Sequence, residues 1–162
     1  MSAPRFCERC AAPLAPREAD GRARLACTAC DFVRYDNPTP VVAALVEHPT
    51  GVLLVRNKGW PAGWLGLVTG FLERDETPEA GCLRELREEL GLDGEIVRMI
   101  GVYAFPMRNE LIVAYHVRAA GEIVVGDELE QVKAVPADKL RPWPLGTGEA
   151  VRDWLAARAA SA

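Results

Sequence analysis

The stretch 70–92, GFLERDETPEAGCLRELREELGL, constrains this chain more than any other part of its sequence. If its second half forms a helix, Glu85, Glu88 and Glu89 lie on one face, because residues three and four positions apart are neighbours on a helix surface. Like-charge pairs at these spacings cost about 0.2–0.5 kcal/mol each, and only two arginines lie close enough along the chain to offset them. Mg²⁺ binds in proteins through carboxylates and substrate phosphates. The pattern therefore predicts an acidic helix face that holds a divalent cation.

Both ends of this helix are marked in the sequence. Thr77 can cap the N-terminus, Pro78 suits the first helical position, and Gly91 can adopt the left-handed conformation that ends a helix. Upstream, the apolar run 65–68 is typical of a strand, and Gly70 then begins a tight loop whose unhindered carbonyl can also face a metal. We therefore predict a strand, a glycine loop and an acidic helix as one unit.

The spacing of the fixed residues in this stretch resembles the Nudix box at every specified position. The matching pattern is Gly70, five residues, Glu76, seven residues, and then Arg84-Glu85-Leu86-Arg87-Glu88-Glu89-Leu90-Gly91-Leu92. A plain acidic surface helix, which is the alternative, would match this pattern only by chance. Members of the Nudix hydrolase family cleave a nucleoside diphosphate linked to another group X, with Mg²⁺ or Mn²⁺ as cofactor. The resemblance implies this chemistry without identifying X.

By the same resemblance, residues 37–162 form a Nudix hydrolase domain, an α+β fold in which a mixed sheet lies between helices as an αβα sandwich. Apolar runs rich in β-branched residues predict strands at 41–48, 52–56, 94–106, 111–120 and 131–136, and an apolar stripe predicts a helix over 145–160. Cys82 lies between apolar residues and is expected to be a small buried side chain. Trp60 and Trp64 occupy a Gly- and Pro-rich loop, where each is either a core aromatic or a platform for a base.

The resemblance also implies a role for each charged residue of the box. The three helix glutamates would be catalytic metal ligands, with the carbonyl of Gly70 as an additional ligand. Glu76 would be a supporting carboxylate. Arg84 is expected to pair with Glu76 and orient the cluster, because a bidentate guanidinium fixes a carboxylate better than a lysine does.

The general base is less constrained, because Nudix enzymes use either a box glutamate or an acid from a later loop. Glu128 lies about where that loop acid falls in relatives with a zinc ribbon, and is the candidate base. The alternative is that Asp127, Glu128 and Glu130 form a solvated acidic turn. His48 at a turn and His116 within a strand have no nearby partner of the metal-binding type and are expected to be bystanders.

The N-terminal residues 1–36 contain two C-x2-C pairs, Cys7 with Cys10 and Cys27 with Cys30, separated by sixteen residues. This spacing is typical of a four-cysteine zinc site, in which four thiolates leave no position for water, so the zinc would be structural. Two disulfides and a redox-active C-x2-C are the alternatives. The segment between the pairs suggests a hairpin with its turn near Asp20-Gly21. We therefore predict a small zinc ribbon.

Composition limits the partners and the location of the protein. The N-terminal sequence MSAPRFCERC lacks the apolar core of a signal peptide, and no segment reaches the roughly 18 apolar residues that span a bilayer. We therefore expect a cytoplasmic protein without membrane contact. The net charge is −4, and residues 1–36 carry six Arg against five acidic residues. Tight nonspecific binding to nucleic acid needs clustered Lys and Arg, so nucleic acid is not an expected partner.

A zinc ribbon followed by a Nudix domain is similar to the NADH pyrophosphatases and to a group that includes FAD and ADP-ribose pyrophosphatases. The NADH pyrophosphatases carry an SQPWPFP-type motif after the box, where this chain has VYAFPMRNELIVAYHV (102–117). Phe71 matches their Gly-Phe pair, and its flat ring is expected to stack on a nicotinamide or an adenine.

We therefore expect a small-molecule nucleotide substrate of the ADP-ribose, FAD or NAD(H) type, cleaved to AMP and a second phosphate ester. A nucleoside triphosphate hydrolase, an RNA-end (cap) hydrolase and a non-catalytic nucleotide-sensing protein are the alternatives. Since many relatives complete their pockets across an interface, a homodimer is also expected from the resemblance.

Overall fold

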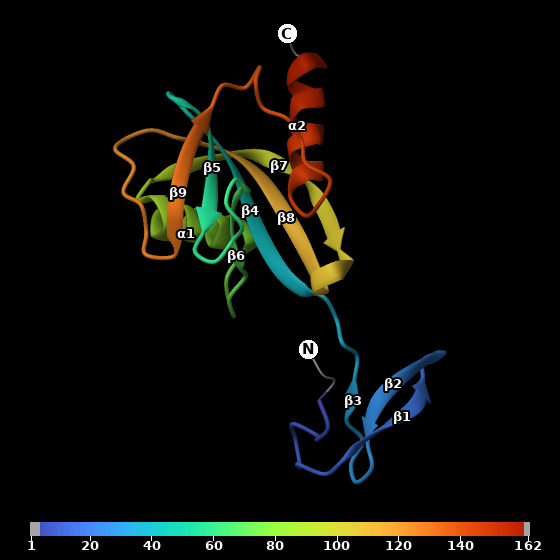
Figure 1. The fold of residues 1–162 in the computed structure, drawn as a ribbon. Helices are drawn as coiled ribbons and strands as arrows, with labels where there is room; N and C mark the ends of the chain where they lie inside the picture. The colour runs from blue at the N-terminus through green and yellow to red at the C-terminus, as the bar shows by residue number, and fades with distance from the viewer. Residues whose placement is uncertain (1–3, 161–162) are drawn as a thin grey trace. The chain divides into compact units, whose positions relative to one another are not determined.

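The computed structural model describes residues 4–160, which divide into two compact units between Asn37 and Pro38 (Figure 1). No helix within these described residues is both long and apolar enough to cross a bilayer.

The first unit is a three-stranded antiparallel sheet in the order β1-β2-β3. Its strands are β1 (Leu14–Ala19), β2 (Arg22–Cys27) and β3 (Val33–Arg34). The turn between β1 and β2 consists of Asp20 and Gly21, which both adopt positive φ values, of 52° and 70°. Asp and Gly tolerate this conformation, which matches the twist of a tight hairpin. The predicted hairpin turn is therefore confirmed.

The second unit is built on a six-stranded mixed sheet in the order β7-β8-β4-β5-β9, with β6 also paired to β4. Strands β4 and β8 run parallel, and the other pairs are antiparallel. The elements are β4 (Thr39–His48), β5 (Gly51–Asn57), β6 (Val68–Phe71), α1 (Pro78–Leu90), β7 (Gly94–Phe105), the 3-10 turn η1 (Pro106–Arg108), β8 (Glu110–Ala119), β9 (Leu129–Val135) and α2 (Gly148–Ala160).

The two helices cover opposite faces of this sheet (Figure 1). Successive residues of β4 alternate between the faces, so Val42 and Val46 pack under α1 while Leu45 packs under α2. On the α1 side, Leu86 and Leu90 are fully buried. Burial of a leucine side chain contributes about 1.5–3 kcal/mol, so these leucines anchor the helix that carries the glutamates. The predicted αβα sandwich with a mixed sheet is confirmed.

One local expectation differs from the structure, and one of two alternatives is excluded. Gly70 does not begin a loop: it lies within β6 and pairs with Val42, because β6 continues the sheet past the predicted strand 65–68. Trp64 is not a core aromatic, since 59% of it is exposed, whereas Cys82 is buried as expected.

His116 has a carboxylate partner, contrary to the expectation from sequence. Its Nε2 lies 2.9 Å from Oε2 of Glu47, and its ring packs edge-on against Trp154 with the centroids 5.6 Å apart. Arg158 donates to Oε1 of the same Glu47 at 2.8 Å. These contacts link β4, β8 and α2. They could not be expected from the sequence because the contacting residues lie far apart along the chain. Burial lowers the pKa of His116, although the neighbouring Glu47 acts to raise it.

Candidate active site

The caps of α1 fix where its glutamates lie. Thr77 Oγ1 accepts a hydrogen bond from the backbone N–H of Ala80 at 3.2 Å, and Pro78 occupies the first turn. Gly91 has a φ of 65° and donates its N–H to the carbonyl of Arg87 at 2.9 Å. Both predicted ends of the helix are confirmed, so the register of the acidic face is fixed by local hydrogen bonds.

A cleft of about 850 Å³ lies against this acidic face. The structure brings most of the predicted site residues together along it. Its lining includes Gly70 and Phe71 from β6, Arg84, Glu85, Glu88 and Glu89 from α1, and Asp127 and Glu128 from the loop before β9. Glu76 is absent from that lining and acts on the cleft through Arg84.

Glu89 is the most unusual acid of the cleft. It is only 5% exposed, and its Oε2 atom finds no hydrogen-bond donor among residues 4–160. Burial, together with the negative charges of Glu85, Glu128 and Glu88, raises the pKa of Glu89 to about 8. A buried carboxylate oxygen without a partner is costly unless a cation or a proton compensates it. The position therefore fits a cation ligand.

Glu85 and Glu88 share one guanidinium. Arg84 Nη1 donates to Oε1 of Glu85 at 2.6 Å and to Oε2 of Glu88 at 3.1 Å. Burial raises the pKa of Glu85, whereas Arg84 acts to lower it. Glu88 is the more exposed of the two. One guanidinium thus offsets only part of the charge of three carboxylates.

The pairing of Arg84 with Glu76 is present as expected. Arg84 donates from Nε and Nη2 to the two carboxylate oxygens of Glu76, at 2.9 and 3.0 Å. Glu76 also accepts from the backbone N–H of Glu73 at 3.1 Å, and the Arg84 hydrogen bond lowers its pKa most. A Cβ at Gly81 would lie 2.8 Å from the Glu76 carboxylate, so this helical glycine makes room for the pair. Both carboxylate oxygens of Glu76 thus bind the Arg84 guanidinium.

Gly70 is required by a close approach, not by backbone freedom. A Cβ added at this position would overlap the carboxylate of Glu85. Because Gly70 has no side chain, the Glu85 carboxylate can lie directly against the backbone of β6. This explains a glycine at this position even though its φ is not in the left-handed region.

The loop that carries Glu128 is bonded to the end of α1. Val124 and Gly126 donate their backbone N–H groups to the carbonyls of Leu90 and Glu89, at 2.9 and 2.8 Å. A Cβ at Gly126 would lie too close to the helix backbone. Glu128 is exposed in the cleft, and its charge raises the pKa of both Glu85 and Glu89.

Glu130 lies outside this arrangement. Its Oε2 accepts from Arg56 Nη1 at 2.7 Å, and it is not part of the cleft lining. Of the three acids in the predicted turn, Asp127 and Glu128 therefore face the cleft, and Glu130 forms an ion pair.

Two cations of the cleft, Lys58 and Arg108, were not predicted from the sequence. Both are exposed, and neither forms an ion pair within the part of the chain that the structure describes. Trp60, half-buried, also lines the cleft. These residues come from the β5–β6 loop and from η1, so no spacing along the chain indicates that they meet.

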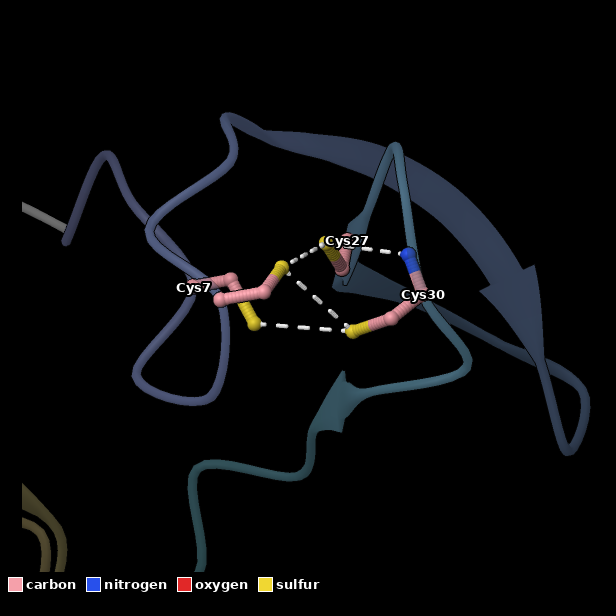
Figure 2. Close-up of side chains that lie close together, drawn as sticks. Cys7, Cys27 and Cys30 are labelled. Carbon is pink, nitrogen blue, oxygen red and sulfur yellow. Dashed lines mark hydrogen bonds between the residues drawn. The ribbon is translucent and has the colours of Figure 1, made fainter.

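The second candidate site is the cysteine cluster of the first unit. Figure 2 shows Cys7, Cys27 and Cys30 pointing toward one another, and the four Sγ atoms, including that of Cys10, lie within 4.8 Å. Three of the Sγ–Sγ distances are 3.5, 3.7 and 3.8 Å. A tetrahedron with Zn–S bonds of about 2.3 Å has edges of about 3.8 Å, so the cluster has the size of a zinc site.

Backbone groups favour the metal-binding form of these thiols. The N–H of Ala29 donates to Cys27 Sγ at 3.3 Å, and that of Arg9 donates to Cys7 Sγ at 3.4 Å. The Ala29 hydrogen bond is the main cause that lowers the pKa of Cys27, to about 6. The thiolate is the form that binds metals. The cluster therefore fits a structural four-cysteine site.

Comparison with known proteins agrees with this geometry. A family model described as NUDIX domain matches residues 37–156, and a zinc-ribbon model described as Nudix N-terminal matches residues 5–36. The chain belongs to the Nudix family.

Among curated Nudix relatives, the chain is similar to the NAD-capped RNA hydrolase NudC of Pseudomonas putida, at 29% identity over 88% of this chain and 51% of that protein. The protein of the same name from Stutzerimonas stutzeri is 30% identical over 89% of this chain and 52% of that protein. The chain thus spans about half the length of the curated relatives it matches.

Solved structures show the same Nudix fold. A NUDIX hydrolase from Nitrosomonas europaea aligns with a TM-score of 0.79 and 24% identity, covering 96% of this chain and 93% of that one. An ADP-ribose pyrophosphatase from Streptococcus suis aligns with a TM-score of 0.62 and 24% identity, covering 75% of this chain and 92% of that one. At this identity the likeness concerns the fold alone.

Proposed function

We propose that this Nudix protein is a divalent-cation-dependent pyrophosphohydrolase that cleaves the diphosphate linkage of an ADP-ribose, FAD or NAD(H)-type substrate. The products would be AMP and a second phosphate ester. The observation that carries the proposal is the buried Glu89 oxygen, which lacks a donor within the described chain and lies near other carboxylates that line the same cleft. Such a group of acids fits a hard cation bound together with a diphosphate.

The acidic residues of the cleft would bind the cation, and Arg84 would position them. Glu85, Glu88 and Glu89, with the Gly70 carbonyl, would hold Mg²⁺ or Mn²⁺. When bound, the cation lowers the pKa of water and neutralises phosphate oxygens. Arg84 holds the carboxylates in place through its bonds to Glu76 and Glu85.

Glu128 would accept the proton of the attacking water. It is exposed in the cleft, and its negative charge contributes to raising the pKa of Glu85 and Glu89. A general base must reach the proton it removes. The backbone bonds of its loop to α1 support Glu128 in this role.

Lys58, Arg108 and Phe71 would bind the substrate. The two cations can pair with the phosphates because, in the described chain, neither is engaged with a carboxylate. Phe71 is 60% exposed and lines the cleft, as a stacking platform for a base requires.

Replacing Phe71 with alanine is expected to raise KM for a dinucleotide about tenfold while changing kcat little. The reason is that base stacking contributes roughly 1–3 kcal/mol to binding and is not part of the bond cleavage. Steady-state kinetics of AMP release would measure this. Trp64→Ala is the matched control, because Trp64 is equally exposed but outside the cleft. Equal effects of both changes would remove Phe71 from the substrate site.

Replacing Gly70 with alanine is expected to lower kcat about a hundredfold with little loss of thermal stability. The added Cβ displaces the Glu85 carboxylate, and a misplacement of about 1 Å can cost this much rate. Kinetics at several Mg²⁺ concentrations and a melting curve would test it. Unchanged kinetics would show that Glu85 need not lie over the β6 backbone.

A substrate panel tests the proposed function itself. ADP-ribose, FAD, NAD⁺, NADH and nucleoside triphosphates would be incubated with the protein and Mg²⁺, and released AMP or pyrophosphate measured. Release of AMP from ADP-ribose, FAD or NAD(H), abolished without divalent cation, is the expected result. Preferred turnover of triphosphates, or tight binding of one nucleotide without turnover of any, would contradict it and favour a triphosphate hydrolase or a nucleotide sensor.

NAD-capped RNA is a second candidate substrate. The support is the name of the curated relatives, NAD-capped RNA hydrolase, and the fact that an NAD cap contains the same diphosphate as free NAD. This finding weighs against the expectation that nucleic acid is not a partner. Release of 5′-monophosphate RNA from a capped transcript, compared with turnover of free NAD⁺, would decide between them. A homodimer and a cytoplasmic location stay predictions.

A further inference from the structure

We propose that one face of the β1–β2 hairpin binds the phosphodiester backbone of single-stranded RNA. The face consists of Arg17, Arg22, Arg24 and Tyr35, and we call it the arginine face. The inference goes beyond the proposed hydrolysis and holds whichever dinucleotide the cleft accepts.

Strand register places the three arginines on the same side of the sheet. Arg17 pairs directly with Arg24 across the β1–β2 ladder, and Arg22 pairs with Ala19. Paired residues share a face, as do residues two apart on one strand. Arg22 and Arg24 are two apart on β2, so all three guanidinium groups arise from one face. Like charges directly opposite each other destabilise a sheet, which points to a role outside folding.

Arg24 and Tyr35 form a flat platform on this face. The Arg24 guanidinium carbon lies 4.4 Å from the centroid of the Tyr35 ring. Its Nε and Nη1 donate to the carbonyls of Ala19 and Tyr35, at 3.3 and 3.0 Å, which fixes the plane. Tyr35 remains 49% exposed. Aromatic rings and guanidinium planes are the groups on which unpaired RNA bases stack.

The acidic residues of this unit are largely held elsewhere, although its total charge is nearly balanced. Glu18 lies on the opposite face of β1, since it alternates with Arg17. Asp31 pairs with Arg9 and Asp36 with Arg34. Asp20 is the carboxylate that reaches the arginine face, where it accepts the Tyr35 hydroxyl at 3.0 Å.

Arg17 and Arg22 are therefore left for an external anion. Both are exposed, and no ion pair between described residues includes either of them. Their forked donors match phosphate geometry. An acidic peptide would satisfy the charges but would leave the stacking platform unused, so single-stranded RNA is the partner that fits both features.

The test measures binding of a fluorescent, uncapped single-stranded RNA to the full zinc-loaded chain without Mg²⁺. The double variant Arg17→Gln/Arg22→Gln is expected to bind about tenfold more weakly. For this variant, the slope of log K for RNA binding against log salt concentration should be shallower by about 1.4, because each phosphate contact to a single strand contributes about 0.7 to the slope. The control Arg98→Gln/Arg152→Gln removes the same charge from exposed positions of the second unit and should bind as the unaltered chain does.

A second pair of variants tests the platform. Tyr35→Ala is expected to weaken RNA binding, and Tyr35→Phe, which keeps the ring, is expected to preserve it. Full zinc content verifies that each variant ribbon is folded. The proposal is overturned if the unaltered chain does not bind RNA, if the control loses as much affinity as the arginine variant, or if polyglutamate competes as well as RNA. Turnover of free dinucleotide should be unchanged in the arginine variant, and failure of that turnover in the unaltered chain would not affect this result.

Discussion

Glu89→Gln is expected to lower kcat by about a thousandfold or more while leaving the fold intact. Gln has the same shape but no charge, so the cleft would lose a carboxylate that has one buried oxygen without a donor in the described chain and that we propose as a cation ligand. In metal-assisted hydrolysis, the ligands position the cation that neutralises the transition state. AMP release from the substrate identified by the panel would measure the loss of activity. Titration with Mn²⁺ would measure the loss of cation binding.

The melting temperature separates loss of chemistry from loss of structure. Without divalent cation, Glu89→Gln should melt at least as high as the unaltered protein, because burial and like charges make ionised Glu89 unfavourable. Glu130→Gln is the matched control: its carboxylate lies on β9 outside the cleft, and Gln can still accept from Arg56. If Glu89→Gln retains activity within about threefold, the metal assignment is wrong.

Cys27→Ser is expected to abolish stable zinc binding and to unfold the first unit. A structural zinc contributes about 10–16 kcal/mol of binding free energy in small domains, and this free energy is largely folding free energy. The first unit is short and holds few buried residues, chiefly Cys7, Ala26 and Cys27, so it cannot replace that contribution. Metal analysis should give much less than one zinc per chain. Amide exchange should lose protection in β1 and β2 but keep it in α1.

The fifth cysteine supplies the control for this experiment. Cys82 is a buried residue of α1, and Cys82→Ala should leave zinc content at one per chain even if the melting temperature falls. A full zinc complement in Cys27→Ser would count against the four-cysteine site.

The parts of the fold that sequence predicted are those with local causes. The bounds of α1 follow from the side chain of Thr77, the ring of Pro78 and the conformational freedom of Gly91, each acting within one helical turn. The hairpin turn at Asp20-Gly21 is equally local. The pairing of Arg84 with Glu76 was also accessible, because a resemblance to a known motif carries tertiary information.

The features that sequence did not predict depend on strand register and on contacts between distant segments. Gly70 belongs to β6 because β4 offers it a partner, and His116 meets Glu47 only when β4 and β8 run parallel. Lys58 and Arg108 come from separate connections that meet only at the cleft. The net charge of residues 1–36 did not predict the arginine face either, because a sum of charges does not show on which side of a sheet the charged residues lie.

The two backbone hydrogen bonds from Val124 and Gly126 to the last turn of α1 also constrain motion. Any thermal displacement of that turn would carry Glu128 along with Glu89. The distance between the Glu128 and Glu89 carboxylates would then stay nearly constant when both move. Substitutions in the loop would be tolerated only where these two hydrogen bonds remain.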